Sequence, residues 1–238
     1  MVVIRNFVVL SLLVSVGLFY MYGRSVWFPV YLKMTGKRTV ADVVQEYGMG
    51  AEQRLVRYFE TAGVAYPPEK MILVAFKDTK KLELWAQHGQ AKTLVHCYEI
   101  QAASGLLGPK LKEGDKQVPE GMYEIIGLNP NSAYHLSMKL NYPNPFDLVH
   151  AKADGRDSPG TNIFIHGKSA SVGCLAMGDI AIEELFTLTH QIGFNNVSVV
   201  ISPTDPMLGE LVVPTGSSEW VSELYKTISA QLSLIRNN

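Results

Sequence analysis

The sequence predicts an α+β protein that is mainly β, with helices toward both ends of the chain. Residues 71–76 (MILVAF) form a short apolar run typical of a buried strand, and residues 82–86 alternate apolar and polar side chains as a half-buried strand does. Residues 220–235 instead repeat apolar side chains at helical spacing. Because 238 residues suffice for one domain with a proper core, we expect one domain built around strands and flanked by helices.

The N-terminus carries a hydrophobic segment. Residues 6–23 (NFVVLSLLVSVGLFYMYG) hold no charge and lie between Arg5 and Arg24. Their length is near the lower limit for a membrane-spanning helix and also fits the core of a secretory signal. No small-x-small cleavage site follows, so the sequence favours an uncleaved anchor over residues 1–24. A removed signal peptide or a buried soluble helix is the weaker alternative.

Residues 25–68 form the predicted helical lead-in. Thr39 and Asp42 have the spacing of a capping box that opens a helix. We expect Gly48 and Gly50 to interrupt this helix, so that a second one runs from about residue 51 to 62. Two prolines at 67–68 end the helical region.

Strand patterns dominate residues 69–205, the predicted catalytic domain. Residues 104–121 are rich in Gly, Pro and charge and are expected to form a long functional or mobile loop. Residues 141–156 are expected to be irregular, and Asp179 is the expected N-cap of a helix to about residue 190. Residues 206–238 are a C-terminal extension whose amphipathic helix Ser217 or Ser218 would cap. The expected strands are 71–76, 82–86, 93–100, 122–126, 134–140, 162–166 and 197–201.

Composition excludes several classes of protein. The formal net charge of −1 argues against a nucleic-acid partner. Cys97 and Cys174 are too few for a disulfide scaffold, and they could form one bridge or remain free. We predict no metal and no other cofactor, because the spacing of the histidines fits no zinc motif such as H-x-x-x-H.

The chemistry is expected in residues 163–179, IFIHGKSASVGCLAMGD. A cysteine nucleophile needs a base beside it, main-chain N–H groups for the oxyanion and a backbone that turns sharply. His166 ends a strand eight residues before Cys174, and Gly173 permits the turn. The amides of Gly173 and Cys174 are the candidate oxyanion-hole donors, and the Gly167 carbonyl could fix the tautomer of His166. Either residue alone would more often be an inert core group, whereas the combination favours catalysis.

This segment resembles the signature of the L,D-transpeptidase catalytic domain (the YkuD-like family). The histidine-glycine pair is His166-Gly167, and the Ser-x-Gly-Cys element runs from Ser171 to Cys174. The continuation CLAMGD, and the stretches Ser104-Gly105, 108–110, 118–123 and 128–131, are similar to the YafK-like branch. The resemblance covers roughly residues 70–203 and implies a β-sandwich-like catalytic domain.

The resemblance also implies a reaction. Cys174 would be the nucleophile that takes an acyl group from a peptidoglycan stem peptide, His166 the base, and Ser171, Gly173 and Gly167 the loop support and oxyanion hole. The acyl group would pass to an amine in a transpeptidase or to water in a hydrolase that acts on stem peptides or a peptidoglycan-linked lipoprotein. Most of the family carries an arginine two residues after the cysteine, and Ala176 stands there in this chain. A non-catalytic cell-wall-binding protein is therefore a further alternative.

This chemistry also implies a location. The bulk of the chain would lie in the periplasm or cell envelope, anchored to the inner membrane through residues 6–23.

The long loop carries charged side chains that could bind substrate. Lys110, Lys112 and Asp115 could contact a carboxylate-bearing peptide, although a solvated loop is the role we favour for them.

Overall fold

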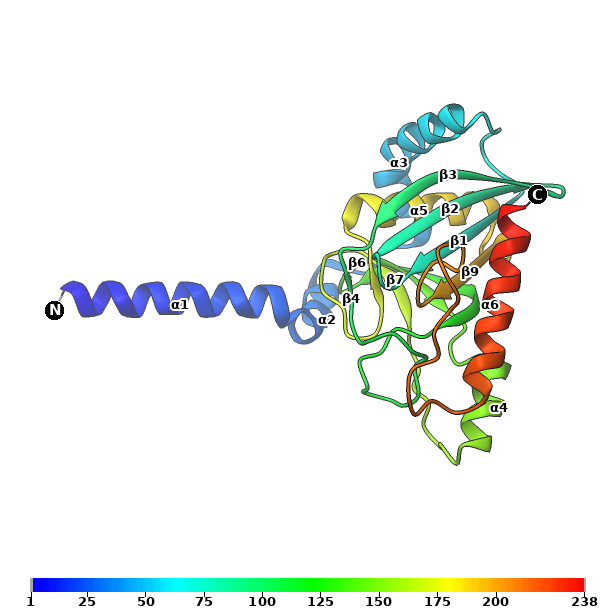
Figure 1. The fold of residues 1–238 in the computed structure, drawn as a ribbon. Coiled ribbons are helices and arrows are strands. Elements are labelled where there is room, and N and C mark those ends of the chain that lie inside the picture. The colour runs from blue at the N-terminus through cyan, green and yellow to red at the C-terminus, as the bar shows by residue number, and fades with distance from the viewer. Residues whose placement is uncertain (1, 238) are drawn as a thin grey trace.

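The computed structural model describes residues 2–237, with the side chains of residues 6–20, 23, 24 and 26–237. Within this range, nine strands form one mixed sheet in the order β3-β2-β1-β9-β5-β6-β7-β8-β4 (Figure 1). The strands are β1 Lys70–Phe76, β2 Lys81–His88, β3 Ala91–Glu99, β4 Ala102–Ala103, β5 Gly121–Ser132, β6 His135–Leu140, β7 Phe164–His166, β8 Leu175–Ala176 and β9 Val197–Ser202. The helices are α1 Val2–Tyr22, α2 Arg24–Thr35, α3 Val40–Ala62, α4 Pro145–Ala153, α5 Asp179–Ile192 and α6 Trp220–Arg236, with a 3₁₀ turn at Phe194–Asn196. The predicted mixed α+β class is confirmed.

The strands connect into one sheet rather than the two sheets of the expected sandwich. Strand β5 is long enough to pair with two neighbours in succession. Residues 121–124 pair with β9, and residues 125–132 pair with β6 across two irregularities in the register. Such irregularities bend a strand, so β5 joins the two halves of the sheet without a break.

Strand β1 explains why the sheet is buried on both faces. Side chains alternate between the faces of a strand. Met71, Leu73 and Ala75 pack into the hydrophobic core that α5 also enters. The alternate residues of β1, Ile72, Val74 and Phe76, pack into a second core with α6. The sheet is therefore a middle layer between α3 and α5 on one side and α6 on the other (Figure 1).

Helix α3 confirms the predicted capping box and corrects the predicted interruption. The Thr39 hydroxyl accepts from the Asp42 amide, and the Asp42 carboxylate accepts from the Thr39 amide. The helix then continues without a break through both glycines to residue 62. Gly48 lies on the buried face of α3, and the buried Leu55 and Phe59 of the same helix pack into the core that α5 also enters.

Three further expectations for helices are wrong. Residues 145–153, expected to be irregular, form α4, which begins with a capping box between Asn144 and Asp147 and has proline in its first turn. Helix α5 is capped by Gly178 rather than by Asp179. The Asp179 carboxylate instead accepts a hydrogen bond from the Lys168 amide at 2.9 Å. Helix α6 has Glu219 at its N-cap instead of a serine.

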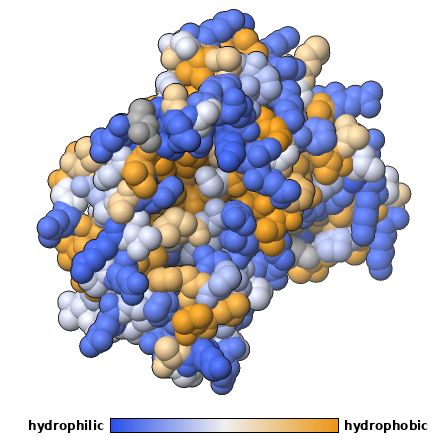
Figure 2. Space-filling model, turned by 90° about the vertical axis from the view of Figure 1, so that its right-hand side faces the viewer, coloured by the Kyte–Doolittle hydropathy of each residue, from blue (hydrophilic) through white to orange (hydrophobic). Residues whose placement is uncertain are grey.

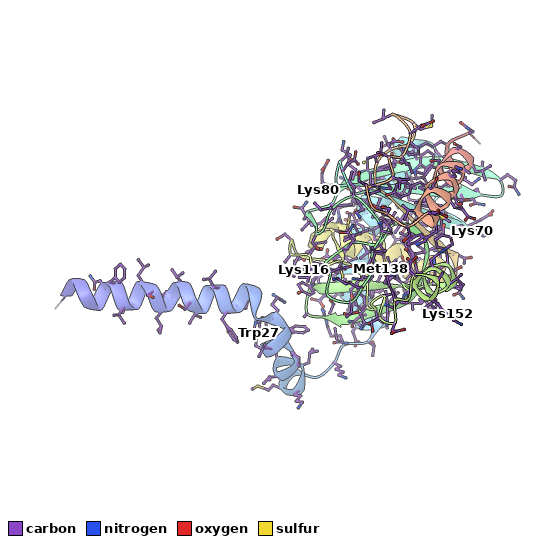
Figure 3. The ribbon with its side chains drawn as sticks, turned by 60° about the horizontal axis from the view of Figure 1, so that its bottom comes forward. Trp27, Lys70, Lys80, Lys116, Met138 and Lys152 are labelled. Atoms are coloured by element: carbon purple, nitrogen blue, oxygen red, sulfur yellow. The ribbon has the colours of Figure 1, made fainter. Side chains whose placement is uncertain are left out.

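Helix α1 projects away from the rest of the molecule (Figures 1 and 3). Its described apolar side chains are largely exposed, as for Phe7 at 75%. Trp27 lies at the elbow where α1 meets α2 (Figure 3), and Arg24 joins α2 to the domain by donating to the Ala133 carbonyl. By length and hydropathy, none of the helices in the described residues could cross a membrane. The predicted anchor over residues 6–23 stays a prediction.

The side of the molecule on which α6 lies has a mixed surface (Figure 2). Hydrophobic side chains are interspersed there with hydrophilic ones. This is ordinary for a folded domain, in which apolar atoms supply more than half of the accessible surface.

Candidate active site

Two adjacent strands carry the predicted nucleophile and base. Strand β7 ends on His166, and Cys174 directly precedes β8. The two strands pair in parallel, with His166 opposite Ala176. Paired residues point to the same face of a sheet, and so do residues two apart. His166 and Ala176 therefore share one face of the sheet, and Cys174 lies two residues before Ala176, in the bend that leads into β8.

The ring of His166 is fixed in a defined orientation. Its Nδ1 lies 2.6 Å from the Gly167 carbonyl oxygen, the contact expected from the sequence. Since a carbonyl can only accept, Nδ1 carries the hydrogen and Nε2 is left with a lone pair. The ring lies 4.6 Å from that of Tyr134 and is 3% exposed. Burial lowers the pKa of His166, although the bond to Gly167 opposes this, so the ring is held in the neutral form that a base requires.

Gly167 is required for steric reasons. A Cβ at this position would lie 2.7 Å from the Tyr134 carbonyl oxygen, 2.8 Å from Asp179 Oδ1 and 3.0 Å from the Cβ of His135. The nearest of these is a backbone atom, so the clash could not be relieved by a side-chain rotation. The Gly167 carbonyl can therefore reach His166 only because the residue has no side chain.

The thiol of Cys174 is partly buried. Its Sγ lies 3.9 Å from the Asn162 carbonyl oxygen, the distance of a weak sulfur hydrogen bond. Burial raises the pKa of the Cys174 thiol, while a hydrogen bond with the Phe164 backbone and the charge of Lys110 oppose that rise. The second cysteine, Cys97, is exposed on β3, at the opposite edge of the sheet from β8 and β4, and both cysteines are free thiols.

The two amides expected to form an oxyanion hole are engaged inside the protein. Gly173, at φ +104°, donates from its amide to Ser104 Oγ at 2.6 Å. The Cys174 amide donates to Ser171 Oγ at 3.2 Å, and the same hydroxyl donates to the Cys174 carbonyl at 2.6 Å. Ser171 and Gly173 thus contribute hydrogen bonds that hold the turn at Cys174. For these amides to bind an oxyanion, a substrate oxygen would have to replace the serine hydroxyls.

Ser104 is a part of the site whose role the sequence did not indicate. Strand β4 pairs with β8 so that Ala103 lies opposite Leu175, and the next step of this register sets Ser104 opposite Cys174. Its hydroxyl donates to the Lys116 carbonyl at 2.7 Å, and its amide lies 3.3 Å from Ser171 Oγ. Ser104 therefore joins the nucleophile turn to the 104–121 loop. A Ser-Gly pair at the start of a long loop was the only signal of this role in the sequence.

The described residues contain no cluster of three or more His, Cys, Asp or Glu side chains able to hold a metal ion. Three of the other histidines have separate partners. His135 contacts Glu183 at 2.9 Å, His96 stacks on Tyr58, and His150 stacks on Trp220.

Comparison with known proteins agrees with this site. A model of the L,D-transpeptidase catalytic domain (YkuD) matches residues 69–205. YafK of Escherichia coli K12, provisionally named an L,D-transpeptidase, is 35% identical over 130 residues, which are 53% of this chain and 50% of YafK. The chain from E. coli O157:H7 matches equally. The chain thus spans about half the length of the curated relatives it matches.

Among solved structures, the helical cell shape determining protein Pgp2 of Campylobacter jejuni aligns with a TM-score of 0.48 and 20% identity, over 69% of this chain and 56% of Pgp2. Bd1075 of Bdellovibrio bacteriovorus aligns with a TM-score of 0.41 and 18% identity, over 69% and 56% of the two chains. The family match covers more than half of the chain. This chain therefore belongs to the L,D-transpeptidase catalytic domain family.

Proposed function

We propose that this protein is a cysteine enzyme that acts on peptidoglycan, with Cys174 as nucleophile and His166 as base, and that it transfers the acyl group of a stem peptide to an amine. The observation that carries the proposal is the pairing of β7 with β8, since Cys174 directly precedes the strand that lies beside His166, while Gly167 fixes the tautomer of His166. Membership of the L,D-transpeptidase catalytic domain family supports it.

The residues suggest the following chemistry. Nε2 of His166 takes the thiol proton, and the sulfur attacks the carbonyl carbon of the bond from an L-centre to a D-centre in the tetrapeptide stem. The tetrahedral intermediate collapses with cleavage of the C–N bond, and the leaving amine takes the proton from His166. A thioester on Cys174 remains. An incoming amine then attacks this thioester, loses a proton to His166 and releases the thiol, so that one amide bond replaces another.

Water could replace the amine in the last step, which would make the protein a hydrolase of stem peptides or of a peptidoglycan-linked lipoprotein. The side chain of Ala176 is fully buried opposite His166, so this position supplies no cation for either acceptor. The two reactions share every step up to the thioester. They differ only in the nucleophile that the site admits afterwards.

The test uses muropeptides with defined tetrapeptide stems and mass spectrometry of the products. A cross-linked dimer that has lost one terminal residue indicates transpeptidation, and a monomer shortened by that residue indicates hydrolysis. We expect no product from Cys174→Ala or His166→Gln. Cys97→Ala is the matched control, because it removes the exposed thiol at the far edge of the sheet. Turnover by Cys174→Ala at the wild-type rate would refute the proposal, and binding without turnover by the wild type would favour a cell-wall-binding role.

The location is part of the proposal. A peptidoglycan substrate requires a periplasmic or envelope position. Attachment of α1 to a membrane, which need not mean that the helix crosses it, would cover apolar side chains that are otherwise exposed. The test is fractionation of cells that express the full chain or a chain that lacks residues 1–24. Recovery of both in the same soluble fraction would refute the anchor.

A further inference from the structure

Lys110 is buried within the loop where the sequence led us to expect solvated side chains. It is 6% exposed, so that expectation is wrong for this residue. Its Nζ donates to the Lys112 carbonyl at 2.9 Å and to Asp115 Oδ1 at 2.5 Å. A lysine ammonium has three N–H donors, so within the described residues one donor remains beyond these two bonds. A buried charge with spare hydrogen-bonding capacity calls for a functional explanation.

Asp115 holds this lysine in place. Its carboxylate also accepts from the backbone amides of Leu111, Lys112 and Gln117, each at 3.0 Å. Burial alone would raise the pKa of Asp115, but the bonds from Lys110 and these amides lower it, so the carboxyl group is ionised at neutral pH. The 110–117 segment is therefore folded around an ion pair with a fixed position.

The same lysine packs against the segment that borders the thiol. A Cβ on Gly160, at φ +103°, would lie 2.6 Å from Lys110 Cε and 3.2 Å from its Nζ. Tyr142 joins the two pieces of chain, because its hydroxyl lies 2.8 Å from the Pro159 carbonyl and 3.3 Å from that of Lys110. Two residues after Gly160, the carbonyl of Asn162 contacts the Cys174 thiol. Lys110 and Cys174 thus flank the same short stretch of backbone.

We propose that Lys110 keeps the Cys174 thiol reactive by stabilising its thiolate form. This inference rests on the proposed function, since it matters for turnover only if Cys174 is the nucleophile. A thiolate is the reactive species, and a fixed positive charge in a water-poor site stabilises it more than the same charge would in water. The direction agrees with the effect of Lys110 on Cys174, which lowers the thiol pKa against the effect of burial. The residue acts through its charge and is a positioning residue rather than a catalytic one.

Other charged groups near the thiol lie on two elements. Glu113 and Asp115 share the loop with Lys110, and Glu113 accepts from the Thr161 amide at 2.9 Å. His166 lies on β7 and is held neutral, and the following Lys168 is paired with Asp179. Two lysines that contact this loop are buried, Lys77 and Lys110. Lys77 donates to the Gly108 and Val118 carbonyls and is paired with Glu120, whereas the charge of Lys110 acts on the Cys174 thiol. Lys112 of the same loop is exposed.

The test measures the rate at which iodoacetamide alkylates Cys174 as a function of pH, in a Cys97→Ala background. In this reaction a sulfur–carbon bond forms, the carbon–iodine bond breaks and iodide leaves, so the rate follows the thiolate fraction. We expect Lys110→Gln and Lys110→Met to move the midpoint of the profile to higher pH and to slow alkylation at pH 7 about three- to tenfold, since one pKa unit is a factor of about ten in that fraction. Lys110→Arg should keep the wild-type midpoint. Lys112→Gln makes the same charge change at an exposed site of the loop and is the matched control.

Profiles of Lys110→Gln and Lys110→Met that superimpose on the wild type, with thermal unfolding showing that the variants are folded, would overturn the inference. Lys110→Met keeps most of the buried stem, so it tests the charge even if Lys110→Gln does not fold. An equal shift in Lys112→Gln would also overturn it, because the effect would then be general to the loop charge. Because alkylation needs no peptidoglycan, a shifted profile together with wild-type turnover by Cys174→Ala would refute the proposed function and leave this inference standing.

Discussion

The Ser104 hydroxyl makes hydrogen bonds to the Gly173 amide and the Lys116 carbonyl, so we expect its removal to lower the stability of the protein. In Ser104→Ala the amide of Gly173, a buried residue, loses its acceptor at 2.6 Å. An unsatisfied buried donor costs about 1–3 kcal/mol. The second lost bond, to the Lys116 carbonyl, counts for less because Lys116 is exposed and water can replace the hydroxyl. For a protein of this size about 1 kcal/mol lowers Tm by roughly 2–4 °C, so the expected fall in Tm is about 2–12 °C.

Thermal unfolding followed by circular dichroism checks this value. Ser104→Thr keeps a hydroxyl and should unfold close to the wild-type temperature. Ser169→Ala lies in the same nucleophile loop but is exposed, and it should leave the Tm unchanged. Turnover of muropeptides by Ser104→Ala should fall about 10- to 100-fold, because a small displacement of a reacting group is enough for such a loss. A wild-type Tm for Ser104→Ala would show that the Gly173 amide finds another acceptor and that Ser104 does not hold the turn.

Three further predictions concern the residues around the site. Gly167→Ala should lower the free energy of unfolding by about 1–3 kcal/mol and abolish turnover, because its Cβ would lie 2.7 Å from the Tyr134 carbonyl oxygen. A folded and fully active variant would contradict this steric argument. Tyr225→Phe should lower the midpoint of urea unfolding without changing m, by the equivalent of about 1–3 kcal/mol, since it removes the 2.7 Å hydrogen bond to buried Glu120; an unchanged midpoint would show that water replaces the hydroxyl. Burial raises the pKa of Asp147 to about 6, so the native state binds more protons than the unfolded state between about pH 4 and pH 6, and stability should fall as pH rises through that window. Asp147→Asn should lose this fall, and an identical pH dependence of urea unfolding in both proteins would contradict it.

The sequence could predict the parts of this fold that local patterns determine. The capping box at Thr39 and the run of residues 71–76 depend on neighbours within one turn or one strand, and the structure confirms both. The uninterrupted course of α3 through Gly48 instead accompanies the packing of its buried face into the core, whose other residues come from distant parts of the chain. Helix propensity favours a break at glycine, but tertiary contact decided the outcome. Helix α4 is hard to predict because two prolines, Pro143 and Pro145, lie close together, as they often do in a loop, although a proline directly after Asn144 is also a signal that a helix begins.

The candidate site divides in the same way. His166, Gly167 and Cys174 lie within nine residues of each other, so their chemistry could be predicted from one segment. Ser104 and Lys110 come from a loop about 60 residues earlier in the chain, and only the pairing of β4 with β8 and the packing of Gly160 bring them to the thiol. The hydrogen bonds that occupy the Gly173 and Cys174 amides could not be predicted either, because the acceptor of one of them is Ser104.

The surroundings of position 176 explain why alanine, and not arginine, fits there. Ala176 is fully buried and lies in register with both His166 and Ala102, so its side chain is enclosed by strands on two sides. A guanidinium group in that position would need a counter-charge and space beside the base, and burying a charge without a partner is costly. The cation that we propose in a comparable role is Lys110, which is paired with Asp115 in the 104–121 loop. If Lys110 stabilises the thiolate of Cys174, His166 needs to act only as the base. The 104–121 loop then affects the site in two ways, through the charge of Lys110 and through the hydrogen bond between Ser104 and the Gly173 amide.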